Sequence, residues 1–82
     1  MKYNIWVEGY CCTGEFGTAR LITSNVEGKS FINAVENWWN SLSKKDKEGW
    51  GGKIYINEEK NYASIWACRL FDNESEARKA FG

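Results

Sequence analysis

The chain has 82 residues, which is enough for one domain with a single small core. Its 11 Lys and Arg residues balance its 11 Asp and Glu residues, so no net field draws it toward nucleic acid or acidic lipid. Histidine is absent, which excludes imidazole base catalysis, His-containing triads and His-ligated zinc. We therefore expect one α+β domain over residues 1–82 with no cofactor and no metal.

The first two expected elements form a hairpin. Lys2–Tyr10 alternates apolar and polar side chains, which is typical of a half-buried strand. Cys11–Gly17 contains two glycines and is expected to be a turn. Thr18–Ser24 alternates again and gives the second strand.

The main helix is expected to begin after Ser30, a favourable N-cap residue. Apolar residues then recur at helical spacing, namely Phe31, Ala34, Val35, Trp38 and Leu42. Trp39 falls on the flank of this stripe and is expected to be at most half covered. The charged, glycine-containing segment Ser43–Lys53 is expected to be a mobile loop that carries Trp50.

Alternation resumes over Lys53–Asn57 and Tyr62–Phe71, which predicts a second hairpin. A short last helix follows, capped by Asp72 or Asn73, with apolar residues Ala77, Ala80 and Phe81 and with Gly82 at its end. The predicted order is ββαββα. Its simplest packing is a four-stranded antiparallel sheet with two helices on one face.

The other sheet face is then left open, and it is the main candidate site. We place ten residues under the helices, where the small ones among them leave room for packing: Tyr3, Ile5, Val7, Ala19, Leu21, Ile54, Ile56, Ala63, Ile65 and Ala67. The open face carries Trp6, Arg20, Tyr55, Tyr62, Trp66 and Cys68. Large flat side chains bury much area at low entropy cost, which favours a binding platform. Two alternatives remain: Trp66, Cys68 and Leu70 face the helices instead, or the aromatic face is a homodimer contact.

Two further tryptophans complete the candidate binding set. Trp50 either inserts into a pocket of a partner or folds back over the core, while Trp39 would extend the surface from the helix flank. The cluster Lys44, Lys45 and Lys47 could touch phosphate but is more typical of a solvated helix end. The candidate binding residues are Trp6, Arg20, Trp39, Trp50, Tyr55, Tyr62 and Trp66.

The three cysteines give neither a disulfide framework nor a CxxC metal motif, because their number is odd and Cys11 and Cys12 are adjacent. We expect reduced thiols and a cytoplasmic, non-membrane protein, since no signal peptide or apolar span is present. The best enzyme alternative is a thiol of the Cys11–Cys12 pair with Glu8 or Glu15 as base, but no cationic environment to activate it is evident. The chain is therefore expected not to be an enzyme.

Both ends of the chain, Met-Lys-Tyr-Asn-Ile-Trp-Val-Glu-Gly-Tyr and Trp-Ala-Cys-Arg-Leu-Phe-Asp-Asn-Glu-Ser-Glu-Ala-Arg-Lys-Ala-Phe-Gly, resemble small phage and mobile-element proteins of low-GC bacteria. This resemblance implies a phage-encoded inhibitor of a host defence protein, for example in a CRISPR system, that acts by occupying its surface. The first hairpin with Ser-Phe-Ile-Asn-Ala-Val-Glu-Asn also resembles HicB-like antitoxin domains in shape. The alternatives are a binder of a small nucleotide or single-stranded RNA, and an antitoxin-like partner protein that forms a homodimer.

Overall fold

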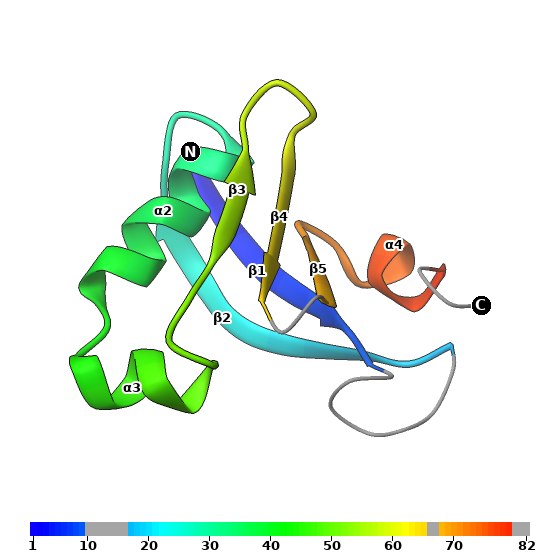
Figure 1. The fold of residues 1–82 in the computed structure, drawn as a ribbon. Helices are drawn as coiled ribbons and strands as arrows, with labels where there is room; N and C mark the ends of the chain where they lie inside the picture. Colours follow the sequence, from blue (N-terminus) through cyan, green and yellow to red (C-terminus); the bar gives the residue numbers. More distant parts are fainter. Residues whose placement is uncertain (10–16, 66–67, 80–82) are drawn as a thin grey trace.

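The computed structural model describes residues 1–9, 17–65 and 68–79. The described elements are β1 (Lys2–Glu8), β2 (Ala19–Glu27), α2 (Phe31–Ser41), α3 (Lys44–Gly49), β3 (Tyr55–Asn57), β4 (Tyr62–Ile65), β5 (Cys68–Phe71) and α4 (Glu74–Lys79). The strands form one sheet in the order β2-β1-β5-β4-β3, and all neighbours are antiparallel. The fold is α+β as expected. The prediction of four strands and two helices is wrong, because the described residues contain five strands and three helices (Figure 1).

The fifth strand arises because the predicted strand Tyr62–Phe71 is divided. β4 ends at Ile65 and β5 begins at Cys68, and these two residues are antiparallel partners. Ile65, Cys68 and Leu70 are all buried on the same side of the sheet. A single straight strand would have placed Ile65 and Cys68 on opposite faces of the sheet. Because the strand is divided, each side chain of β5 points to the face opposite to the one predicted.

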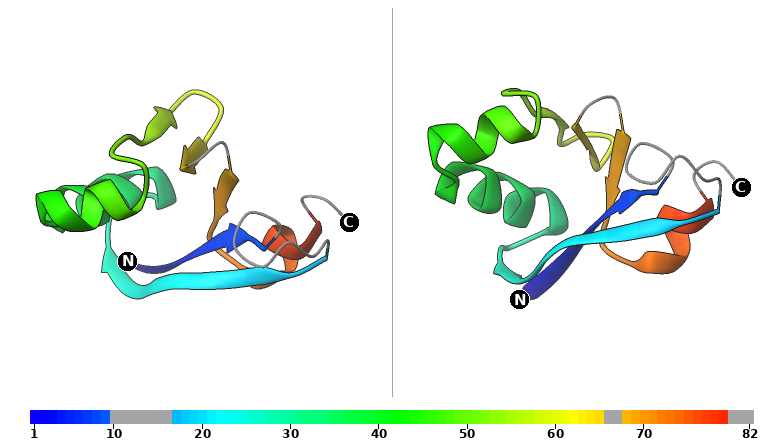
Figure 2. Two further views of the ribbon diagram at one scale, coloured as in Figure 1. Left: turned by 60° about the horizontal axis from the view of Figure 1, so that its bottom comes forward. Right: turned by 90° about the horizontal axis from the view of Figure 1, so that it is seen from below.

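The helices α2 and α4 pack on opposite faces of the sheet. α2 packs against β1, β2 and β4, whereas α4 packs against β1, β2 and β5 from the other side (Figure 2). Asn73, one of the two capping residues that the sequence left open, caps α4, since its Oδ1 accepts a hydrogen bond from the Glu76 N–H at 2.8 Å. The Arg78 guanidinium also donates to the Gly17 carbonyl oxygen at 3.4 Å. The prediction that both helices share one face is therefore wrong.

The face assignment of β2 is also corrected. β1 and β2 shift register between Ile5 and Trp6, so that Ile5 pairs with Thr23 and Trp6 pairs with Leu21, which leaves Ile22 as an extra residue on β2. Such a β-bulge re-aims the side chains that follow it. Leu21, which precedes the bulge and pairs with Trp6, points away from the face that α2 covers and is 43% exposed, while Ile22 packs against the core.

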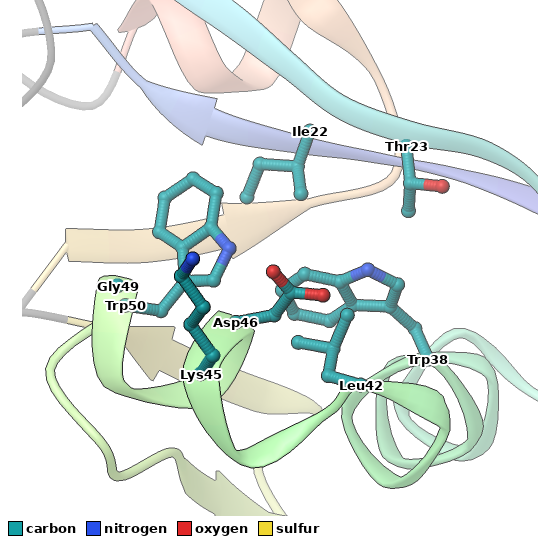
Figure 3. Close-up of a pocket in the computed structure, with 8 residues that line it drawn as sticks. All are labelled: Ile22, Thr23, Trp38, Leu42, Lys45, Asp46, Gly49 and Trp50. Atoms are coloured by element: carbon teal, nitrogen blue, oxygen red, sulfur yellow. The ribbon is translucent and has the colours of Figure 1, made fainter.

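The segment predicted as a mobile loop contains the helix α3. Ser43 is its N-cap, with its Oγ accepting from the Asp46 N–H at 3.2 Å, and Trp50 ends it. The Trp50 ring meets the Trp38 ring edge to face, with centroids 6.2 Å apart (Figure 3). Lys47 lies over the ring of Trp39 at 5.9 Å. Trp50 thus folds back against the core, which was one of the two alternatives predicted for it from the sequence.

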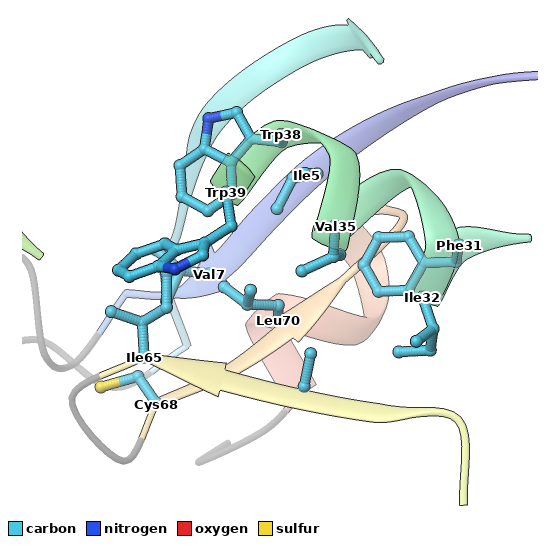
Figure 4. Packing of buried hydrophobic residues seen from close by; sticks show 11 residues of the cluster. Ile5, Val7, Phe31, Ile32, Val35, Trp38, Trp39, Ile65, Cys68 and Leu70 are labelled. Carbon is cyan, nitrogen blue, oxygen red and sulfur yellow. The ribbon is translucent and has the colours of Figure 1, made fainter. Parts of the chain in front are cut away.

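The core lies between α2 and the sheet (Figure 4). α2 begins after Ser30, whose Oγ accepts from the Asn33 N–H at 3.1 Å, which confirms the predicted N-cap. Both Ile32 and Trp39 are buried, at 3% and 9% exposure, because β4 and α3 cover the flanks of α2 in addition to β1 and β2. The expectation that Trp39 is half exposed is therefore wrong. The buried cluster comprises Ile5, Val7, Phe31, Ile32, Val35, Trp38, Trp39, Ala63, Ile65, Cys68 and Leu70.

Candidate functional site

An aromatic and cationic surface lies on the sheet face that points away from α2. It is formed by Tyr55 of β3, Tyr62 of β4, and Arg69 and Phe71 of β5, and we call these four residues the aromatic face. Their neighbours along each strand point inward: Ile56, Ala63 and Leu70 pack in or against the core. Because side chains alternate along a strand, the four residues are directed outward.

The pairing of the strands brings these side chains into contact. Tyr55 and Arg69 each pair with Ser64, from its two sides, so they flank the same position of β4. The Tyr55 and Tyr62 rings meet edge to face at 5.9 Å. The Arg69 guanidinium lies 5.2 Å from the centroid of Tyr62 and 4.9 Å from that of Phe71. One arginine is therefore held against two rings.

Exposure differs across the aromatic face. Tyr55 is 56% exposed and Arg69 is exposed, whereas Tyr62 and Phe71 are half-buried. A shallow cavity of about 290 Å³ next to Tyr55 and Tyr62 is completed by Asn57 and Lys60. The accessible groups are thus two phenol rings, an amide, an ammonium and a guanidinium.

A second recess borders the aromatic face where α4 crosses the sheet. It has a volume of about 220 Å³ and is lined by Glu8, Arg69, Phe71, Glu76 and Lys79. Glu8 is only 5% exposed, and burial raises the pKa of its carboxyl group above the ordinary value of 4.5. α4 therefore closes one end of the outward face, and the part that carries Tyr55 and Tyr62 stays open.

The structure brings together only some of the residues predicted for the site. Tyr55 and Tyr62 lie on the aromatic face, and Trp6, half-buried, continues it through its pairing with Phe71 on one side and Leu21 on the other. Arg20 is exposed but pairs with Val7, so it belongs to the face that α2 covers. Trp66 lies outside the described residues.

Three other predicted positions are inside the protein. Trp39 is buried, Trp50 is half-buried against the core, and Cys68, expected on the open face, is 1% exposed. Cys68 is also disulfide-bonded, which corrects the expectation of reduced thiols; Cys11 and Cys12 lie outside the described residues. Arg69 and Phe71 were missed, because no Gly, Pro, Asn or Asp marks the break between β4 and β5 that turns them outward.

No protein-family model, curated protein or solved structure matches this chain. Within the described ranges, no group of three or more Cys, Asp or Glu side chains is placed to hold a metal ion. No helix among the described residues is long and apolar enough to cross a membrane.

Proposed function

We propose that this chain is a binding protein that occupies the surface of a partner protein through the aromatic face. The observation that carries the proposal is the placement of the Arg69 guanidinium against the rings of both Tyr62 and Phe71. Tyrosine and arginine are among the residues that most often dominate binding energy at protein interfaces. Here they stand next to one another on a sheet face.

The geometry supports binding because the side chains are ordered before a partner arrives. A free arginine loses about 0.5–1.5 kcal/mol of side-chain entropy when an interface immobilises it. Contact with two rings reduces this cost for Arg69, and the guanidinium group is exposed and can donate hydrogen bonds to a partner. We expect a carboxylate of the partner to accept those bonds and an apolar group to cover Tyr55, which is 56% exposed.

The resemblance of both chain ends to small phage proteins supports a host protein as the partner and inhibition by occlusion as the mode of action. An inhibitor of this kind needs no chemistry of its own. The aromatic face therefore acts only by binding the partner and blocking access to its surface.

The test is capture of partners from host lysate with the tagged protein, followed by calorimetry with the purified partner. Arg69→Ala and Tyr55→Ala should each weaken binding by about tenfold or more. Lys29→Ala is the matched control for charge, because Lys29 is exposed at the turn before α2 and does not line the cavity beside Tyr55 and Tyr62. Arg69→Lys keeps the charge and loses the planar group, so it should bind nearly as poorly as Arg69→Ala.

Binding that survives both aromatic-face variants would refute the proposal. So would equal loss with Lys29→Ala, because that result would indicate a general charge effect.

A second candidate is a single-stranded RNA or nucleotide binder, and it is favoured by the cavity that combines Tyr55, Tyr62, Asn57 and Lys60. Two rings, an amide and a cation are the groups that hold an unpaired base and its phosphate. Anisotropy with a labelled uridine-rich oligonucleotide separates the candidates. RNA binding should weaken steeply with salt, and Lys60→Ala should lower the salt dependence.

A further inference from the structure

A groove separates β2 from α3 on the opposite side of the sheet from the aromatic face. Its volume is about 410 Å³, and Figure 3 shows Ile22 and Thr23 of β2 facing Trp38, Leu42 and Trp50 across it. Ile22, Leu42 and Trp50 are only half-buried against the core. No residue of α3 is buried. The groove therefore has an apolar floor, and its outer wall is a helix without a buried residue.

One side of this groove is an edge of the sheet. β2 is the first strand in the order β2-β1-β5-β4-β3, so only β1 pairs with it. Among the described residues, no backbone hydrogen bond links Ala19–Glu27 to a further strand on the other side. Unpaired N–H and C=O groups along an edge are a template for another extended chain. The bulge at Ile22 directs both Ile22 and Thr23 into the groove beside this edge.

The charged residues around the groove indicate the chemistry of a ligand that would bind there. Lys45 and Asp46 of α3 stand at its rim. Arg20 pairs with Val7 and so projects from the same face of β2, and it is exposed. The lining itself holds one cation and one anion, and Arg20, two positions before Ile22 on β2, adds a second cation beside it. An occupant with an apolar side chain for the floor and carboxylates on either side would be complementary to it.

We propose that the groove between β2 and α3 is a docking site for an extended acidic segment of a partner protein, which lies along the edge of β2 and inserts one large apolar side chain between Ile22 and Trp50. In strand addition the main chain supplies hydrogen bonds, and pockets for alternate side chains supply specificity. An apolar residue opposite Ile22 points into the groove. The residues two positions away on either side point the same way, and there acidic side chains meet Arg20 and Lys45.

A second copy of this chain fits the groove less well. Pairing two β2 strands would bring a second Arg20 and a second Lys45 to the same edge, where like charges oppose each other. A small apolar ligand would fill the floor but leave the edge of β2 unpaired. An extended acidic segment can pair with the edge of β2, place an apolar side chain on the floor of the groove and bring carboxylates to Arg20 and Lys45.

Gly49 is a position from which a larger side chain can obstruct the groove. A Cβ atom added at Gly49 meets nothing within 4 Å, and Gly49 is not among the residues with positive φ. Gly49→Phe therefore adds a ring at a position that lines the groove, and its Cβ atom meets no steric clash. Glu48→Phe is the matched control, because it puts the same ring on the neighbouring exposed position that does not line the groove.

The test is selection from a displayed library of random peptides of about ten residues against the full chain. We expect enriched sequences to share one large apolar residue with Asp or Glu two positions away on at least one side. Gly49→Phe should weaken the best peptide by about tenfold or more, Lys45→Glu by severalfold, and Glu48→Phe hardly at all. The indole N–H resonance of Trp50 should shift during titration with that peptide.

Three results would overturn the proposal: no enrichment over an empty support, undiminished binding to Gly49→Phe, or a chain that is dimeric in sedimentation and becomes monomeric with Gly49→Phe. The last would make a second copy the occupant. Arg69→Ala should not affect the peptide, so failure here is distinguishable from failure of the aromatic face as a binding surface.

Discussion

The rings of Trp38 and Trp50 meet at an angle of 72°, with their centroids 6.2 Å apart. Trp38 belongs to α2, whereas Trp50 directly follows α3, so this contact fastens α3 to the core. We expect Trp50→Ala to lower the free energy of unfolding by about 2–3 kcal/mol, from lost burial and the lost edge-to-face contact. Urea denaturation followed by circular dichroism measures this change.

Tyr55→Ala is the control for that substitution. It also removes an aromatic ring, but one that is 56% exposed, and should cost less than about 1 kcal/mol. Equal losses in the two variants would show that Trp50 does not anchor α3.

Close packing between Gly28 and α2 gives a second prediction. A Cβ atom added at Gly28 would lie 2.5 Å from the Ala34 nitrogen and 2.7 Å from the Ala34 Cα. Backbone cannot yield as a flexible side chain would, so Gly28→Ala should destabilise the fold by about 1–3 kcal/mol. For a domain of this size, thermal denaturation should show a midpoint lowered by at least about 4 °C. Gly49→Ala, where the added Cβ meets nothing within 4 Å, should leave the midpoint unchanged or raise it.

Glu8 gives a pH-dependent prediction. Burial raises the pKa of its carboxyl group, so the folded state favours the protonated form. Its contribution to stability is fully present below the ordinary value of 4.5 and is lost as the pH rises through the raised pKa. The charged groups that share its recess are Arg69, Glu76 and Lys79.

Glu8→Gln should therefore be more stable than the wild type near neutral pH, and the difference should shrink toward zero as the pH falls below about 4.5. Urea midpoints of both proteins across this range test it, with Glu59→Gln as an exposed control. A difference that grows toward acid pH would contradict the assignment.

The disulfide of Cys68 limits the number of free thiols in the oxidised chain. The sequence has 3 cysteines, so one intrachain disulfide leaves one free thiol. The denatured oxidised chain should titrate with one equivalent of thiol reagent, and the reduced chain with three. Reduction should also lower the thermal midpoint, because the disulfide restricts the unfolded chain. Three equivalents without reductant would show that Cys68 is unpaired in solution.

The sequence was sufficient for elements whose signals are local. Ser30 and the apolar spacing after it predict α2, and alternation predicts the face assignment of Ile5 and Val7 in β1. α3 also has a local signal, the cap residue Ser43 three positions before Asp46, but the charges and glycines around it favoured a loop.

The remaining features depend on how strands meet. The bulge at Ile22 is a property of the pairing of β1 with β2, and no residue type in β2 announces it. The antiparallel pairing of Ile65 with Cys68 likewise follows from packing against α2. This is why Tyr55 and Tyr62 could be placed on the candidate site from alternation, whereas Arg69 could not.

The position of β1 between β2 and β5 has a consequence for how the chain is made. β1 spans Lys2–Glu8, yet one of its two partners, β5, is completed only at Phe71. During synthesis the first hairpin can form early, but its second edge must wait until β5 has left the ribosome. Contacts of such long sequence separation slow folding, because the entropy of closing the loop is lost before they form. Until then, one edge of β1 remains open to pairing with other chains.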